Sequence, residues 1–238
     1  MKTGKWIGRA GLAGMILLSF NVAHAVENGG IVSGAVTYKG KGRPANLKVD
    51  HDLEVCGKHP IRDESLLVAA DGGLANAVVW LEGVSGGKEM PTSEAAMDQS
   101  GCAYVPHVLA IGVGQKILFK NSDAVLHNIN SFPKENRPLN LSLLAAGQGR
   151  PLKRSFPLAD EIKVTCDAHK WMSAWIVVRD NPYFAVTDSK GRYKIADIPP
   201  GKYRLVVWHE TAGRMQKDIV VQPKKAATEN LALPAAKR

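Results

Sequence analysis

Several functional signatures are missing from this sequence. It does not contain the His-Glu-x-x-His motif of zinc peptidases, and no paired-carboxylate pattern stands out. The haem-attachment pattern Cys-x-x-Cys-His is also absent. We therefore expect no hydrolase and no covalently attached haem, and we expect the chain not to be an enzyme.

Aromatic residues are scarce, at 6% of the 238 residues, whereas the chain has 23 glycines and 13 prolines. No helical periodicity persists over several turns, and short runs such as Glu161–Cys166 alternate apolar and polar residues instead. This composition predicts an all-β fold of sandwiches or barrels. Residues 85–100 have no clear period and predict a linker or long loop, and Leu139–Ala146 is compatible with one or two helical turns.

Long apolar runs are missing except at the N-terminus. A positively charged start, an apolar stretch from about Ala10 to Ala23 and the small residues of Ala23-His24-Ala25 are typical of a secretory signal peptide of residues 1–25. The alternative, a membrane anchor, needs a run of about 20 apolar residues. We therefore expect a periplasmic or secreted protein with no membrane association after signal cleavage.

The charge pattern gives little support to nucleic-acid binding. The formal net charge is +9, and removal of the three basic residues of residues 1–25 leaves +6. The basic residues are scattered, and export separates the protein from most nucleic acid, so we expect no nucleic-acid partner. The positive charge either steers an acidic partner or belongs to a generally basic exported protein.

The three cysteines are an odd number for an exported protein. Thiols tend to pair in oxidising compartments, so one cysteine is left over and needs a reason. Our hypothesis is a Cys56–Cys102 disulfide, with Cys166 kept as a metal-binding thiolate. Cys56 with the nearby His59 remains an alternative second metal site.

The segment after Glu161 carries the strongest chemical pattern. Cys166, His169 and Met172 lie within seven residues where a predicted strand ends, and His127 lies 39 residues upstream of Cys166. One thiolate, two imidazoles and a weak axial thioether form a ligand set that suits copper. Zinc also accepts thiolate and imidazole, but methionine is a poor zinc ligand.

The same residues resemble a known family. Residues 100–180 resemble a cupredoxin with the short ligand loop of amicyanin-like members. The resemblance rests on the Cys-x-x-His-x-x-Met loop, the upstream Asn-Ser-Asp and His-Asn segments, and the preceding run from Tyr104-x-Pro106 to Val113-Gly114-Gln115. The resemblance implies a Greek-key β-sandwich with one copper ion bound by His127, Cys166, His169 and Met172. It also implies that Asn128 fixes the ligand loop and that the copper is reached near the surface through the His169 loop. Lys170 stands where amicyanins usually have proline.

A second module is expected from the two ends of the chain. Asp188–Tyr193 followed by Ile198–Tyr203 resembles the carboxypeptidase regulatory-like β-sandwich, which is related in shape to transthyretin. We predict this module over residues 183–238, paired with a first part over residues 26–90. The combination resembles exported methylamine-utilisation-type proteins.

Two functions therefore compete. The first is one-electron transfer or copper delivery by an exported protein, with a redox partner such as a c-type cytochrome or a dehydrogenase. The absence of any His-x-His pair argues against the oxygen-reducing cluster of multicopper oxidases. The second is a periplasmic binding or scaffold protein that recognises a protein or glycan and holds a structural metal.

Overall fold

The structure is a computed structural model that describes residue 1, residues 28–43 and residues 45–235. Apart from Met1, the predicted signal peptide of residues 1–25 lies outside the described residues. Within the described ranges, no helix is both long enough and apolar enough to cross a membrane.

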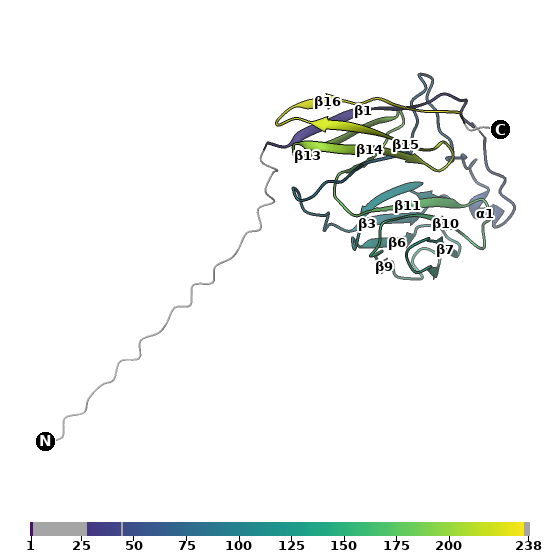
Figure 1. The fold of residues 1–238 in the computed structure, drawn as a ribbon. Helices are drawn as coiled ribbons and strands as arrows, with labels where there is room; N and C mark the ends of the chain where they lie inside the picture. Colours follow the sequence, from purple (N-terminus) through teal and green to yellow (C-terminus); the bar gives the residue numbers. More distant parts are fainter. Residues whose placement is uncertain (2–27, 44, 236–238) are drawn as a thin grey trace.

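The described part of the chain is built almost entirely of β-strands, which confirms the predicted all-β fold (Figure 1). The single short helix of this part is α1 (Leu53–Cys56). The strands are β1 (Gly30–Tyr38), β2 (Val78–Glu82), β3 (Ala95–Gln99), β4 (Tyr104–Val105), β5 (Val108–Gly112), β6 (Ile117–Asn121), β7 (His127–Phe132), β8 (Asn140–Leu143), β9 (Leu152–Arg154), β10 (Asp160–Thr165), β11 (Ser173–Arg179), β12 (Phe184–Val186), β13 (Arg192–Ile198), β14 (Gly201–His209), β15 (Gly213–Val221), β16 (Ala226–Thr228) and β17 (Leu231–Leu233).

One sandwich, which we call the terminal sandwich, is made from both ends of the described chain. Its first sheet has the order β13-β1-β16 with β17 also on β1, and its second has the order β12-β2-β14-β15. The two sheets enclose an apolar core that includes Val36, Leu74, Leu81, Leu205 and Ile219. Strands from residues 30–82 therefore pair directly with strands from residues 184–233.

The middle of the chain forms a second sandwich, which we call the central sandwich. One sheet has the order β5-β11-β10-β7-β8 and the other β4-β3-β6-β9. Met97, Phe119, Ile129, Ile162 and Ile176 lie in the core between them. β3 lies inside the stretch predicted as a linker or loop, and it pairs in parallel with β6. Leu139–Ala146, for which helical turns were considered, contains the strand β8 instead.

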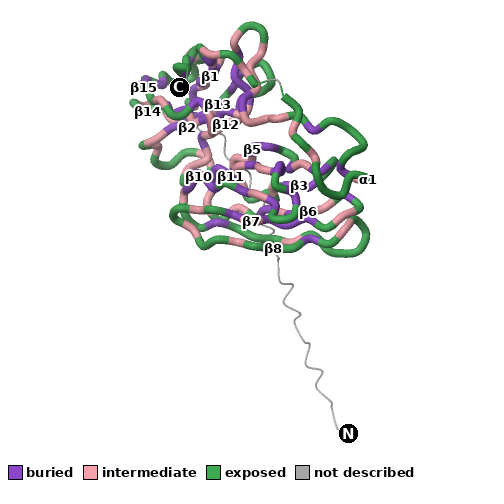
Figure 2. The backbone as a smooth tube through the Cα atoms, turned by 90° about the vertical axis from the view of Figure 1, so that its right-hand side faces the viewer, coloured by how far each residue is buried: buried purple, intermediate pink, exposed green. Residues whose placement is uncertain are grey.

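The two sandwiches stack on each other, so the four sheets form successive layers (Figures 1 and 2). Successive side chains of a strand point to opposite faces. On β2, Val79 and Leu81 therefore enter the terminal core, while Val78 and Trp80 pack against Val177 of β11. The strand β11 thus links the interface between the sandwiches to the end of the central core where the predicted metal ligands lie.

Residues 45–63 leave the terminal sandwich and pack on the central one. We call this segment the cap. Its neck is closed by backbone hydrogen bonds from the Leu47 amide to the Ile61 carbonyl and from the Asp63 amide to the Ala45 carbonyl, both 2.8 Å. Cys56 and Ile61 are buried in the central core, so the cap forms part of the wall of that sandwich.

Candidate metal centre

The strand arrangement brings the four predicted ligands to one end of the central sandwich. His127 begins β7, Cys166 directly follows β10 and Met172 directly precedes β11. β10 pairs antiparallel with both β7 and β11, so these three strand ends are neighbours. All four side chains are buried, with His127 and His169 fully inaccessible.

Three donor atoms converge. The Nδ1 atoms of His127 and His169 are 2.8 Å apart, and the Cys166 Sγ is 3.6 Å from the His169 Nδ1. All three residues offer ligand atoms within 4.8 Å of one another. The loop that carries them is closed by backbone hydrogen bonds from the Met172 amide to the His169 carbonyl (2.9 Å) and from the Cys166 amide to the Met172 carbonyl (3.3 Å). Met172 is thereby held beside the other three residues.

The outer nitrogen of each imidazole contacts a carboxylate. The His127 Nε2 is 3.0 Å from Asp123 Oδ2, and the His169 Nε2 is 2.8 Å from Asp52 Oδ2. Such a partner fixes the proton on Nε2 and leaves the lone pair on Nδ1, which is the usual arrangement of a metal-binding histidine. Two lone pairs and a thiolate then face one another, and a cation among them relieves their mutual repulsion. The donor set therefore fits a metal ion.

The separations agree with this interpretation. A nitrogen at about 2.1 Å and a sulfur at about 2.3 Å from one ion, in tetrahedral directions, lie about 3.6 Å apart. The Cys166–His169 distance has this value. Two nitrogens on one ion lie about 3.4 Å apart by the same geometry. The two histidine rings, at 2.8 Å, would therefore separate slightly around an ion.

Cys166 is prepared for ionisation. Burial alone would raise the pKa of its thiol, but His127, the Asn128 amide and His169 outweigh burial and lower this pKa from 9.0 to about 6. In the metal-free site, a proton shared among the two Nδ1 atoms and the sulfur takes the place that an ion would have. The thiolate is the metal-binding form of cysteine, so the site favours the protonation state that a metal needs. Cys166 is also the free cysteine of the described chain.

Asp123 is held rigidly as the partner of His127. Its carboxylate accepts hydrogen bonds from the amides of Gly101 (2.7 Å) and Cys102 (2.8 Å). Burial acts to raise the pKa of Asp123, but its bonds to His127 and to these amides lower the pKa overall. Burial likewise opposes protonation of His127, yet Asp123 and Cys166 raise the His127 pKa. The electrostatics of this pocket therefore favour positive charge near His127.

Asn128 holds the loop that carries Cys166 through hydrogen bonds to Asp167. Its Oδ1 accepts the Asp167 amide proton at 2.6 Å, and its Nδ2 donates to Asp167 Oδ2 at 2.7 Å. Asn130 and Asn140 also donate to Asp167. This network ties the strand that carries His127 to the loop that carries Cys166.

The sequence reasoning missed the acidic residues around the ligands. Asp123 precedes His127 by only four positions, and this short spacing was a weak indication that the two side chains lie close together. Asp52 is separated from His169 by 117 positions, and nothing in the linear pattern relates the two. The expected access to the metal through the His169 loop is wrong, because Asp52 and the cap cover His169, whose side chain has no exposed area.

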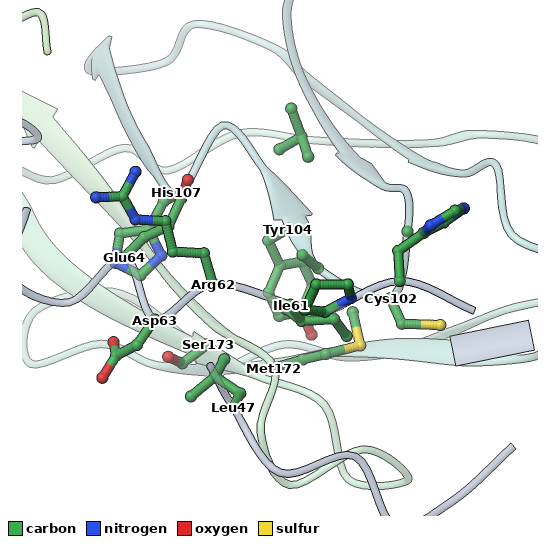
Figure 3. A pocket seen from close by; sticks show the side chains of 15 residues that line it. Leu47, Ile61, Arg62, Asp63, Glu64, Cys102, Tyr104, His107, Met172 and Ser173 are labelled. Carbon is green, nitrogen blue, oxygen red and sulfur yellow. The ribbon is translucent and has the colours of Figure 1, made fainter. Parts of the chain in front are cut away.

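A pocket of about 320 Å³ lies on the Met172 side of the site (Figure 3). Met172, Tyr104 and His107 contribute to its lining from the central sandwich, and residues 59–64 contribute from the cap side. The Tyr104 hydroxyl donates to the Asn128 carbonyl at 2.6 Å, which links this wall to the ligand strand.

Cys56 and Cys102 form a disulfide with a sequence separation of 46 residues. It joins α1 of the cap to the loop between β3 and β4. Because its sulfur is in the disulfide, Cys56 offers no thiolate for the alternative metal site with His59.

Comparison with known families and sequences gives a partial match only. A family model described as polysaccharide lyase family 4, domain II matches residues 157–229, which is less than half of the chain. This range extends from β10 through most of the C-terminal strands of the terminal sandwich. The expected carboxypeptidase regulatory-like module finds no support in this match. A search of curated proteins finds no match to the chain.

Among solved structures, similar chains include a nitrite reductase, a cupredoxin and an amicyanin. The copper-containing nitrite reductase from Thermus scotoductus is 21% identical over 41% of this chain, with a TM-score of 0.33, and the match spans only 25% of the reductase. A purple cupredoxin from Nitrosopumilus maritimus is 24% identical, covers 36% of this chain and 99% of its own length, and has a TM-score of 0.30. Amicyanin from Paracoccus versutus is 16% identical, covers 38% of this chain and 86% of its own length, and has a TM-score of 0.32.

Proposed function

We propose that this chain binds one copper ion through His127, Cys166 and His169, with Met172 as a weak fourth ligand, and that it exchanges single electrons with a redox partner. The observation that carries the proposal is the convergence of two Nδ1 atoms and one Sγ, with both outer imidazole nitrogens bonded to carboxylates. This arrangement fixes the ligand atoms before any ion arrives.

Copper bound by one thiolate and two imidazoles supplies one-electron chemistry. The residues of this chain provide the surroundings. The four ligand side chains are buried and so exclude water, and the lowered pKa of Cys166 keeps the thiolate available near neutral pH. The hydrogen bonds of Asn128 to Asp167 hold the loop in one arrangement, which limits rearrangement when the charge of the site changes.

Copper is favoured over zinc by the sulfur of Met172. A thioether suits copper and is a poor ligand for zinc. Met172 is almost fully buried, and its amide is hydrogen-bonded to the carbonyl of the ligand His169. Zinc in the same three-residue set is the alternative metal.

The proposed location is the periplasm or the exterior of the cell, with a c-type cytochrome or a dehydrogenase as the redox partner. The Cys56–Cys102 disulfide supports an oxidising compartment, where such bonds persist. The formal charge of +6 without residues 1–25 would steer an acidic partner toward the protein.

The visible absorption spectrum of the Cu(II)-loaded protein tests the proposal. We expect an intense thiolate-to-copper band that disappears in Cys166→Ala. The control is His59→Ala, which should retain the band, because His59 of the cap belongs to no candidate metal-binding group among the described residues. Reversible reduction and reoxidation should remove and restore the band. A protein that binds copper without such a band contradicts thiolate ligation at Cys166.

A second candidate function is that of an exported binding or scaffold protein in which a metal only stabilises the fold. The match to polysaccharide lyase family 4, domain II favours it, because that description names a protein that acts on glycans. The carboxypeptidase regulatory-like assignment of residues 183–238 stays a prediction within this alternative. A metal that shows no redox change over the accessible potential range would favour this function over electron transfer.

A further inference from the structure

Asp52 reaches the candidate metal centre from outside the sandwich that contains it. It lies in the cap, and its Oδ2 is 2.8 Å from the His169 Nε2. The His169 side chain is fully buried while that of Asp52 is about half exposed, at 49%. Asp52 therefore stands between a ligand ring and solvent.

The local conformation of Asp52 is directed to this contact. Its backbone is left-handed, with φ 48° and ψ 43°, a region that non-glycine residues adopt infrequently and that tends to mark functional positions. An aspartate before a helix normally accepts a hydrogen bond from the first turn of that helix. The Asp52 carboxylate makes no such bond with α1, and its contact is with His169 instead.

The Cys56–Cys102 disulfide connects the two carboxylates that hold the histidines. On one side, the Cys56 amide donates to the Asp52 carbonyl at 2.8 Å. On the other side, the Cys102 amide donates to Asp123 Oδ2, which contacts His127. A single covalent bond thus fixes the positions of Asp52 and Asp123 relative to each other.

We propose that the cap closes the metal centre, with Asp52 as a positioning residue for His169 and the Cys56–Cys102 disulfide as its anchor. The inference rests on the proposed function, because it concerns exchange of the ion that the site would bind. In this arrangement the ion leaves only when the cap lifts, since His169 cannot turn away while Asp52 holds its outer nitrogen. The cap thereby adds slow metal release to a site that the central sandwich alone would leave open at His169.

The first test is the rate of copper release from the Cu(I)-loaded protein to an excess of a strong Cu(I) chelator. Asp52→Gly removes the carboxylate and suits the left-handed backbone, so the cap keeps its conformation. Loss of such a supporting carboxylate typically weakens metal binding about 10-fold to 100-fold, and we expect release to accelerate by a similar factor. Asp52→Asn keeps one acceptor oxygen and should restore part of the slow release.

The matched control is Asp50→Asn, two positions away in the same cap, whose carboxylate contacts only the exposed His51 among the described interactions. It should release copper at the wild-type rate. The double variant Cys56→Ser with Cys102→Ser should release copper faster, in the same direction as Asp52→Gly. Release from Asp52→Gly within twofold of wild type, with the copper spectrum unchanged, overturns the proposal.

A second measurement works without copper. In the metal-free protein, ¹⁵N-edited NMR of the histidine rings should show a His169 Nε2–H that exchanges slowly with solvent in the wild type and in Asp50→Asn, and rapidly in Asp52→Gly. Rapid exchange in the wild type would overturn the role of Asp52. If the wild type binds no copper, the proposed function fails, and this signal still decides whether Asp52 holds His169.

Discussion

The two sandwiches of this protein fill their interiors differently. The terminal core consists of aliphatic and aromatic side chains such as Val36, Leu81 and Leu205. The central core begins in the same way around Phe119 and Ile162 but ends in two buried imidazoles, a thiol and the buried carboxylate of Asp123. Burial of polar groups is unfavourable unless each finds a partner. The buried polar cluster at one end of the central sandwich therefore disfavours folding unless its hydrogen bonds compensate for the loss of water.

The partners of these polar groups explain why the central sandwich needs extra support. His127 and His169 are bonded to carboxylates, and one of these carboxylates is supplied by the cap rather than by the sandwich itself. The cap is held by a disulfide, whereas the terminal sandwich has no disulfide among its described residues. The disulfide thus attaches the cap to the sandwich that has the more polar core.

The largest expected effect is loss of this attachment. A disulfide that closes a loop of 46 residues stabilises a fold by about 4 kcal/mol through restriction of the unfolded chain. The variant Cys56→Ser with Cys102→Ser should therefore lower the free energy of unfolding of the central sandwich by about that amount. Denaturant unfolding measures it, with Cys166→Ser as the control that keeps the disulfide. Equal stability of the double variant and the wild type would contradict the assigned role.

The corresponding change in the terminal sandwich is a cavity in its apolar core. Leu81 is fully buried between the two sheets, and truncation of a buried leucine typically lowers stability by about 2–5 kcal/mol. Leu81→Ala should show this loss in denaturant unfolding while the Cu(II) absorption spectrum stays unchanged. The control is Val220→Ala, at an exposed position of β15. An altered copper spectrum in Leu81→Ala would mean that the two sandwiches are coupled.

A third effect concerns pH and the one buried histidine of β14. Burial lowers the pKa of His209 from 6.5 to about 4, against the opposing charge of Glu210. The neutral ring accepts hydrogen bonds through Nδ1 from the amides of Thr211 and Ala212, which a proton on Nδ1 would remove. The unfolded chain binds this proton more readily, so the stabilisation is complete above pH 6.5 and is lost as pH falls toward 4.

The lowered pKa of His209 corresponds to a loss of about 3 kcal/mol in the free energy of unfolding between pH 6.5 and pH 4. The free energy of unfolding of the wild type should fall between pH 7 and pH 4.5 more steeply than that of His209→Asn, whose amide oxygen can accept from the same amides without titrating. Identical pH profiles of the two proteins would contradict the assignment to His209.

Elements that depend on a few consecutive residues could be predicted from the sequence, whereas contacts between residues far apart in the chain could not. The alternation of Glu161–Cys166 predicted a strand that the structure has at Asp160–Thr165, because period-two patterning is a property of neighbouring residues. The turn at Asp188–Gly191 is also found, with the Gly191 amide bonded to the Asp188 carbonyl at 2.8 Å. Such signals depend on a few consecutive residues.

The cap illustrates what could not be predicted. Its residues have no strong pattern, and their packing on the central sandwich depends on contacts with residues 40 to 120 positions away, such as Cys102 and His169. β8 was misjudged for a related reason. Asn140–Leu143 has neither a clear strand pattern nor a helical one, and its pairing with β7 decides its conformation.

The smallest effect compares a carboxylate of each sandwich. Asp123 accepts three hydrogen bonds, from Gly101, Cys102 and His127. In Asp123→Asn only one acceptor oxygen remains, so the new NH₂ group must face at least one N–H donor. The side chain of residue 123 therefore fixes the orientation of the His127 ring less firmly. We expect copper affinity to fall about 10-fold or somewhat more, as for other partners of metal-binding histidines.

Asp71→Asn provides the counterpart in the terminal sandwich, because Asp71 also accepts a backbone amide, that of Gly73 at 3.1 Å, but touches no candidate ligand. Competition titration of copper against a chelator of known affinity measures both variants. A loss in Asp123→Asn alone would show that carboxylates of the central sandwich serve the ligand set. Equal losses in both would mean that copper affinity reports general stability, and the distinction between the two sandwiches would then fail.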